Sequence, residues 1–204
     1  MRLVLCAIAL VLLAGCAVNP ATGRSNFVMM SEQQELDLGR RYNQEIAKQN
    51  PRHADDALQT DVQQIGEQVA RASHRSQLGY QFTVVDSADI NAFALPGGYI
   101  YIHRGLLAYL NSEAELAAVL GHEVGHVTAR HSVRQQSQST AWGLLGQAAA
   151  IGTGVGAVGD LTSAMGNAFV RGYGRDMELE ADGLGAQYLA RGGYDPQAMI
   201  EVVK

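Results

Sequence analysis

Two histidines and a glutamate stand close together near the middle of the chain, at His122, Glu123 and His126. Residues four apart lie on one face of a helix, so both imidazoles can direct a nitrogen at the same metal ion. Zinc accepts such nitrogen ligands, and a catalytic zinc site takes three protein ligands and a water molecule. Glu123 flanks the histidine pair and is placed to take a proton from that water. The pattern therefore indicates a hydrolytic zinc site.

The same pattern also arises by chance, on helices that carry two surface histidines. Here apolar residues surround the motif, so two histidines without a ligand would lie near a core. A buried polar group without a partner costs about 1–3 kcal/mol, which argues against the chance interpretation. A structural zinc site is disfavoured as well, because such sites close with four ligands that are mostly cysteines.

A carboxylate for the third ligand position is available in the predicted helix at about 176–190. Glu178 and Asp182 are four residues apart and share one face of that helix. We expect Glu178 to complete the ligand set and Asp182 to accept the far N–H of a ligand histidine, fixing its tautomer. Glu180 is the competing ligand, but it points elsewhere and is expected to be a solvated acidic residue.

The other four histidines are expected to take no part in metal chemistry. His131 lies five residues past His126 and is therefore off the ligand face. His103 follows a predicted strand, and both residues are interpreted as ordinary polar histidines. His53 and His74 lie in polar surroundings.

These motifs, in this order, resemble the gluzincin zinc metallopeptidases. Flanking segments narrow the resemblance to the branch with the CAAX prenyl endopeptidases, HtpX and the periplasmic BepA- and LoiP-type lipoprotein proteases. The segments are Asn91–Ala94, Pro96–Gly98, Tyr99–Ile102 and Glu178–Asp182, and the match spans roughly residues 31–200. The resemblance implies an endopeptidase of the bacterial cell envelope with one zinc ion per chain. Its substrates would be unfolded or misassembled envelope proteins, and it would partner the outer-membrane assembly machinery.

The resemblance also assigns substrate binding to Tyr99, Ile100 and Tyr101. Gluzincins lay the substrate backbone along an edge strand, and Pro96 beside this predicted strand indicates an edge position. The alternative is an ordinary core strand. An edge strand can also hold β-barrel clients without cutting them, so a chaperone-like or latent factor is the alternative function. The presence of Glu123 favours the enzyme, because a pure binding protein has no need of a base there.

The N-terminus has the features of an exported lipoprotein. Residues 1–15 combine Arg2, an apolar run and the ending Leu13-Ala14-Gly15-Cys16, which resembles a bacterial lipobox. We therefore expect residues 1–15 to be a signal peptide, Cys16 to carry lipid and residues 16–30 to form a tether. The absence of Asp after Cys16 suggests the outer membrane, facing the periplasm. The alternative is an ordinary secretory signal in which Cys16 is incidental.

Residues 31–204 are expected to form one metallopeptidase domain, either truncated at its C-terminus or belonging to a short member of the family. Helical patterns at 31–50, 57–72, 112–130 and 176–190, with strands at 80–85 and 99–102, predict a mainly helical α+β fold. Its sheet would be small, and zinc would lie between two helices. With 15 basic against 20 acidic residues and no basic stretch, nucleic acid is excluded as a partner.

The uncharged segment 141–159 is crowded with glycine and alanine and admits two interpretations. We prefer a mobile helix and loop that connects the two metal-binding helices and covers or plugs the cleft. The alternative is a membrane span, because 19 uncharged residues approach the about 20 that a bilayer requires. The many glycines make the segment a poor hydrophobic span.

Overall fold

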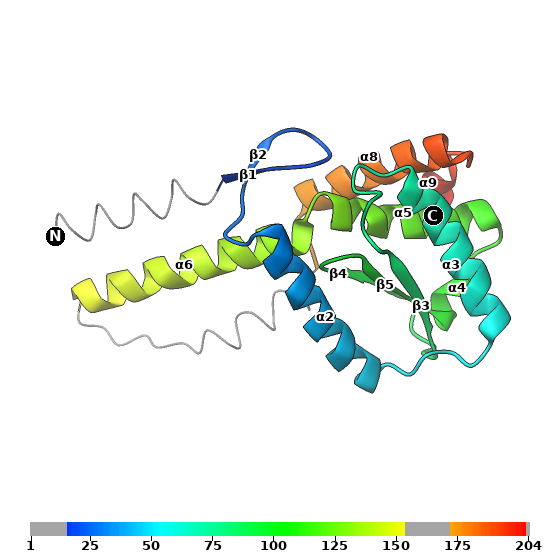
Figure 1. The fold of residues 1–204 in the computed structure, drawn as a ribbon, viewed down its shortest axis with the longest axis horizontal. Coiled ribbons are helices and arrows are strands. Elements are labelled where there is room, and N and C mark those ends of the chain that lie inside the picture. The colour runs from blue at the N-terminus through cyan, green and yellow to red at the C-terminus, as the bar shows by residue number, and fades with distance from the viewer. Residues whose placement is uncertain (1–15, 154–171, 203–204) are drawn as a thin grey trace.

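A three-stranded sheet with helices on both faces forms the body of the domain (Figure 1). The computed structural model describes residues 16–153 and 172–202. The elements, in chain order, are β1 (Cys16–Val18), β2 (Ser25–Phe27), α2 (Glu32–Gln49), α3 (Asp56–Arg71), β3 (Gln81–Val85), β4 (Ala92–Leu95), β5 (Tyr99–His103), α4 (Arg104–Leu107), α5 (Glu113–Thr128), α6 (His131–Thr153), α8 (Arg175–Gly192) and α9 (Ala198–Glu201). The predicted mainly helical fold with small sheets is confirmed.

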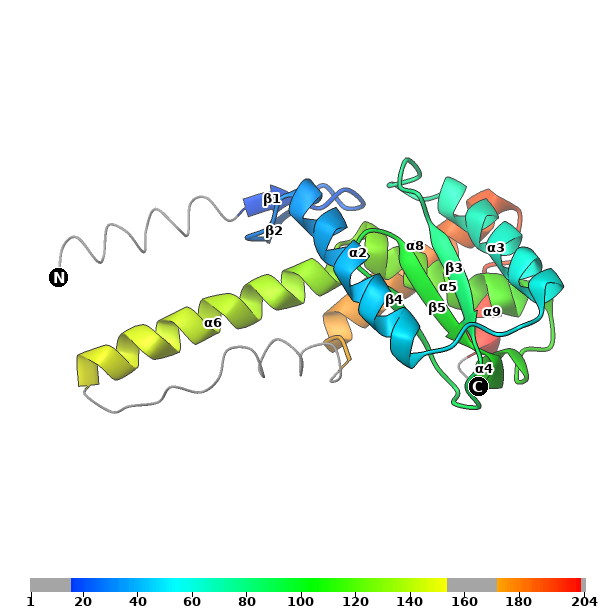
Figure 2. The same ribbon diagram turned by 60° about the horizontal axis from the view of Figure 1, so that its bottom comes forward.

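The sheet has different helices on its two faces. One face packs on α3 and α5, with α8 behind α5, and its strands contribute side chains such as Phe82 and Ile102 to the main core. The other face is covered by α2, whose Tyr42 and Ile46 pack against the cluster of Val85, Leu95 and Tyr101. Figure 2 shows α2 crossing this face.

The prediction that Tyr99–Ile102 is an edge strand is wrong. The strand order is β3-β5-β4, so β5 is central, parallel to β3 and antiparallel to β4. Leu95 pairs with Tyr99 across a tight turn in which Gly97 and Gly98 adopt φ angles of 81° and 98°. Such positive φ angles favour glycine, so the Pro-Gly-Gly sequence folds β4 back onto β5. The backbone of β5 is therefore paired on both sides, and β3 and β4 are the two edge strands.

Helix α5 is buried along most of its length and carries the His-Glu-x-x-His motif through the core. Its first turn is capped by the Ser112 hydroxyl, which accepts from the Glu115 N–H at 3.2 Å. Two glycines let α8 approach closely. A Cβ on Gly125 would lie 2.8 Å from the carbonyl oxygen of Ala181, and one on Gly121 would lie 2.6 Å from the Leu189 side chain. The close approach brings the first turns of α8 beside the motif.

A buried ion network fixes the end of α5. Glu35 of α2 is almost fully buried, and its carboxylate accepts from Arg75 at 2.8 Å and from Arg130 at 2.7 Å. Arg75 also donates to the carbonyl of Val127 at 3.1 Å. Arg130 itself has a φ of 57°, a left-handed conformation that is unusual for a residue other than glycine. This turn separates α5 from α6 and sets where His131 begins the next helix.

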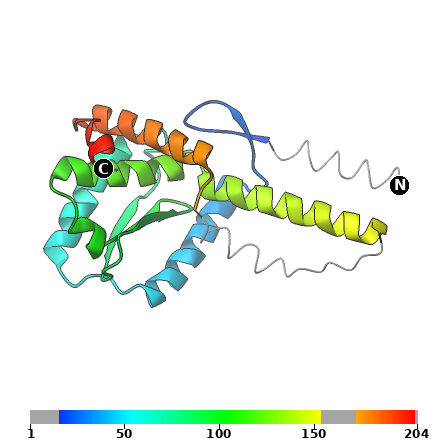
Figure 3. The same ribbon diagram turned by 180° about the vertical axis from the view of Figure 1, so that it is seen from behind.

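Two segments differ from the sequence-based expectations. The expected tether, 16–30, contains an antiparallel hairpin of β1 and β2, which packs on α6. Residues 141–153 belong to α6, which leads away from the body of the domain (Figures 1 to 3), so this part does not cover the body as a lid would. Residues 154–159 lie outside the described part of the chain. Among the described helices, none combines the length and apolar character that crossing a bilayer requires.

Candidate metal centre

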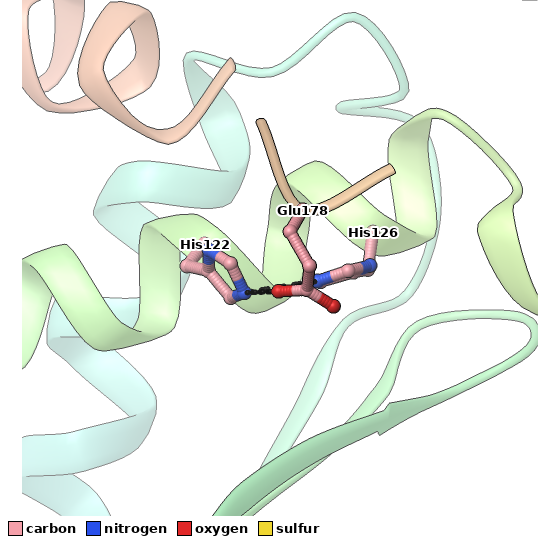
Figure 4. Close-up of side chains that lie close together, drawn as sticks. All are labelled: His122, His126 and Glu178. Carbon is pink, nitrogen blue, oxygen red and sulfur yellow. Dashed lines mark hydrogen bonds and ion pairs between the residues drawn. The ribbon is translucent and has the colours of Figure 1, made fainter. Parts of the chain in front are cut away.

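Three side chains from α5 and α8 converge on one point, as Figure 4 shows. The Nε2 atoms of His122 and His126 are 2.9 Å apart. Glu178 Oε2 lies 3.4 Å from the first of these nitrogens and 3.8 Å from the second. The three potential ligand atoms all lie within 4.8 Å of one another. Two imidazole nitrogens and one carboxylate oxygen make a donor set that suits a catalytic metal ion with an open position.

The carboxylates of α8 divide between two sides of the helix. Asp182 Oδ1 lies 2.8 Å from Nδ1 of His122, the ring nitrogen that faces away from the cluster. Glu178 faces the histidine pair, whereas Glu180 faces His131 and Arg134. Glu180 was expected to be solvated, but its side chain is only 20% exposed, because α6 and the N-terminal hairpin cover it.

Histidine 131, interpreted from the sequence as an ordinary polar residue, is fully buried beside the cluster. Its Nδ1 lies 2.9 Å from Nδ1 of His126. In one continuous helix, His131 would point away from the face that carries His122 and His126. The left-handed conformation of Arg130 ends α5 and starts α6 in a new direction, and this turns His131 toward the site. Tyr173 stacks on His126, with ring centroids 4.2 Å apart. The five-residue spacing of His126 and His131 gave no signal for the first contact. Tyr173 is distant from His126 in the sequence, so the second contact gave no signal either.

Burial tunes the ionisation of two groups at the centre. It lowers the pKa of His126 to about 2, with help from the neighbouring His122 and His131. This histidine therefore stays neutral, as a metal ligand must be. Burial raises the pKa of the Glu123 carboxyl to about 7, against a lowering by His122. A carboxyl whose pKa lies near neutrality is suited to both taking and returning a proton.

A pocket of about 360 Å³ opens beside the cluster. His122, Glu123, Glu178 and Asp182 line it together with Asn91, and the remaining lining residues are Ile90, Ala92, Leu106, Ala118, Val119, Met199 and Val202. Asn91 and Ala92 thus shape the cleft, whereas Phe93 stacks on Tyr101 at 5.0 Å. Tyr99, Ile100 and Tyr101 do not line this pocket, and the edge strand that borders it is β4.

The buried carboxyl should make the stability of the metal-free protein depend on pH. Glu123 has a pKa of about 7 when folded, above its ordinary 4.5, so the folded state holds this proton more tightly. The tighter binding of this proton stabilises the folded state fully below pH 4.5, and this stabilisation is lost as the pH rises through 7. In chelator, Glu123→Gln should be more stable than wild type at pH 8, on the order of 3 kcal/mol, and the difference should shrink toward pH 5. Urea titrations at pH 5 and pH 8 measure the difference in free energy of unfolding between the two proteins. The same difference at both pH values would contradict the raised pKa of Glu123.

The chain is similar to known metallopeptidases over most of its length. Residues 56–204 match peptidase family M48. The beta-barrel assembly-enhancing protease of Escherichia coli (strain K12) is 31% identical over 196 residues, which cover 88% of this chain and 39% of that protein. A putative beta-barrel assembly-enhancing protease of Vibrio cholerae is 32% identical over 176 residues, 81% of this chain and 36% of that protein. The mitochondrial metalloendopeptidase OMA1 of Arabidopsis thaliana is 39% identical over 129 residues, 63% of this chain and 26% of that protein.

The match identifies the family of this chain, but it covers only part of each relative's length. The chain spans less than half the length of these three proteins. The matched region nevertheless contains both α5 and α8, and with them the whole cluster. The predicted metallopeptidase resemblance is confirmed, and the chain belongs to peptidase family M48.

Proposed function

We propose that this domain is a zinc-dependent endopeptidase of the bacterial cell envelope. The observation that carries the proposal is the convergence of His122, His126 and Glu178 within 4.8 Å, with Glu123 lining the same pocket. Nitrogen and carboxylate donors in a set of three are typical of catalytic zinc. The three residues would hold one zinc ion per chain.

The residues at and around the cluster have different roles in the proposed hydrolysis of a peptide bond. Zinc, when bound, supplies Lewis-acid polarisation of the scissile carbonyl and of the attacking water. Glu123 takes the proton of that water and later delivers it to the departing amine. Asp182, 2.8 Å from Nδ1 of His122, accepts its N–H and directs the other nitrogen at the cluster.

Substrate binding is proposed for β4, in place of Tyr99, Ile100 and Tyr101. The edge of the sheet at β4 borders the pocket, through Asn91 and Ala92. An extended peptide can add to such an edge by backbone hydrogen bonds. This arrangement accepts unfolded segments and excludes chains that are already folded.

The proposed location and substrates rest on the N-terminal sequence and on the relatives. Lipid on Cys16 would hold the domain at the outer membrane, facing the periplasm. Relatives that cover most of this chain bear the name beta-barrel assembly-enhancing protease. We therefore propose unfolded or misassembled envelope proteins as substrates, with the outer-membrane assembly machinery as a partner.

A cleavage assay on one client in two states tests the proposal. The zinc-loaded protein should degrade a urea-unfolded β-barrel outer-membrane protein and leave the same protein, folded in detergent, intact. Glu123→Gln should degrade neither form. Binding of the unfolded client without any cleavage by wild type would instead indicate the chaperone-like or latent alternative. Palmitate labelling in cells checks the anchor: wild type should take up label and Cys16→Ala should not.

A further inference from the structure

A chain of hydrogen bonds continues from the metal centre into the protein, behind His126. His126 Nδ1 lies 2.9 Å from His131 Nδ1, and His131 Nε2 lies 3.1 Å from Glu180 Oε2. The Glu180 carboxylate also accepts from Arg134 Nη1 at 2.7 Å and from Asn19 Nδ2 at 2.7 Å. We call His126, His131 and Glu180 the buried relay. The buried relay is separate from the contact of Asp182 with His122.

Burial lowers the pKa of His131 to about 4, so the ring is neutral near pH 7, and the contacts of a neutral His131 assign one arrangement of protons. Glu180 receives two other donors, so it acts as an acceptor and His131 donates to it from Nε2. His131 then presents the lone pair of its Nδ1 to His126. His126 must therefore carry its own proton on Nδ1, which leaves the lone pair on Nε2. That Nε2 is the atom directed at His122 and Glu178.

We propose that His131, oriented by Glu180, is a positioning residue that fixes the tautomer and ring direction of His126. The inference rests on the proposed function, in which His126 is a metal ligand. His131 is fully buried and His126 is 3% exposed, so no solvent competes for these hydrogen bonds. The reverse tautomer of His126 would place a proton in the centre of the cluster, where it would oppose a metal ion.

The relay and the two further residues that donate to Glu180 come from four elements of the fold. His126 belongs to α5, His131 and Arg134 to α6, Glu180 to α8, and Asn19 to the turn of the N-terminal hairpin. Asn19 is 3% exposed and its side-chain oxygen accepts from the N–H of Ala21 at 2.9 Å, which leaves its amide group to donate to Glu180. The hairpin thereby reaches the metal centre through two hydrogen-bonded side chains.

Two substitutions at position 131 separate positioning from packing. Gln can accept from His126 with its oxygen and donate to Glu180 with its amide, whereas Leu fills the space and makes neither hydrogen bond. His131→Leu should weaken zinc binding about 10–100-fold, as is usual when an outer partner of a ligand is lost. His131→Gln should retain affinity within a few-fold of wild type. Competition with a chromophoric chelator measures both values.

The matched control is His103→Leu, because His103 is also buried, at the end of β5. Within the described part of the chain, neither of its ring nitrogens has a hydrogen-bond partner. This variant removes a buried imidazole of the same size and should leave zinc affinity unchanged. Circular dichroism on all three variants verifies folding.

The tautomer of His126 can be read without any metal. Long-range ¹⁵N–¹H spectra of the metal-free wild type should show the proton on Nδ1, and His131→Leu should move population toward Nε2. A wild-type proton on Nε2 would overturn the inference, as would a folded His131→Gln that binds zinc no better than His131→Leu. If wild type binds no zinc, the proposed function fails, while the spectrum still decides whether the relay sets the tautomer.

Discussion

Glu123→Gln is expected to lower peptide hydrolysis by about 10²–10⁴-fold while the variant still binds one zinc ion per chain. The amide keeps the shape of the buried side chain but cannot take a proton from water. Glu123 is 7% exposed and lines the pocket without belonging to the three-residue cluster, so its loss removes a base and not a ligand. Casein hydrolysis and metal content, measured on the same samples, give the two values.

Glu113→Gln is the matched control, because Glu113 lies on the same helix and is exposed. Within the described part of the chain, its carboxylate accepts a hydrogen bond from the Tyr194 hydroxyl at 2.8 Å. This variant should cleave casein at the wild-type rate. If Glu123→Gln also cleaved at that rate with matched metal content, the proposed role of Glu123 would be wrong.

Glu178→Ala is expected to lose zinc affinity by more than the about 10–100-fold that removal of an outer partner costs, and to lose hydrolysis with it. The reason is that Glu178 supplies the single carboxylate of the cluster, at 3.4 Å and 3.8 Å from the two histidine nitrogens. Two imidazoles alone leave the three-ligand set of a catalytic zinc site incomplete. Elemental analysis after dialysis against a weak chelator measures the occupancy.

Asp176→Ala provides the comparison for this variant, since Asp176 is an exposed acidic residue in the same first turn of α8. It should bind zinc as wild type does. A Glu180→Ala variant should fall between the two, because Glu180 acts on the centre through His131. If Glu178→Ala kept its full zinc content and Glu180→Ala lost zinc, Glu180 would be the ligand in place of Glu178.

The local elements of this protein could be predicted from its sequence because they depend on neighbouring residues. The helices at 31–50, 57–72, 112–130 and 176–190 are found within a few residues of the predicted bounds. Spacing of four residues in a helix is enough to place His122 and His126 together, and Glu178 with Asp182, on one helix face each. The family resemblance added that these two faces should meet.

Contacts between distant segments were decided only by the tertiary structure. The position of β5 in the sheet depends on β4 pairing with it, and four residues beside a turn gave too weak a pattern to reveal that pairing. The burial of His131 depends on one left-handed residue, Arg130, held by Glu35 from α2. Helical periodicity cannot report a contact that arises where the helix ends, so the sequence alone indicated the metal chemistry, and packing determined what surrounds it.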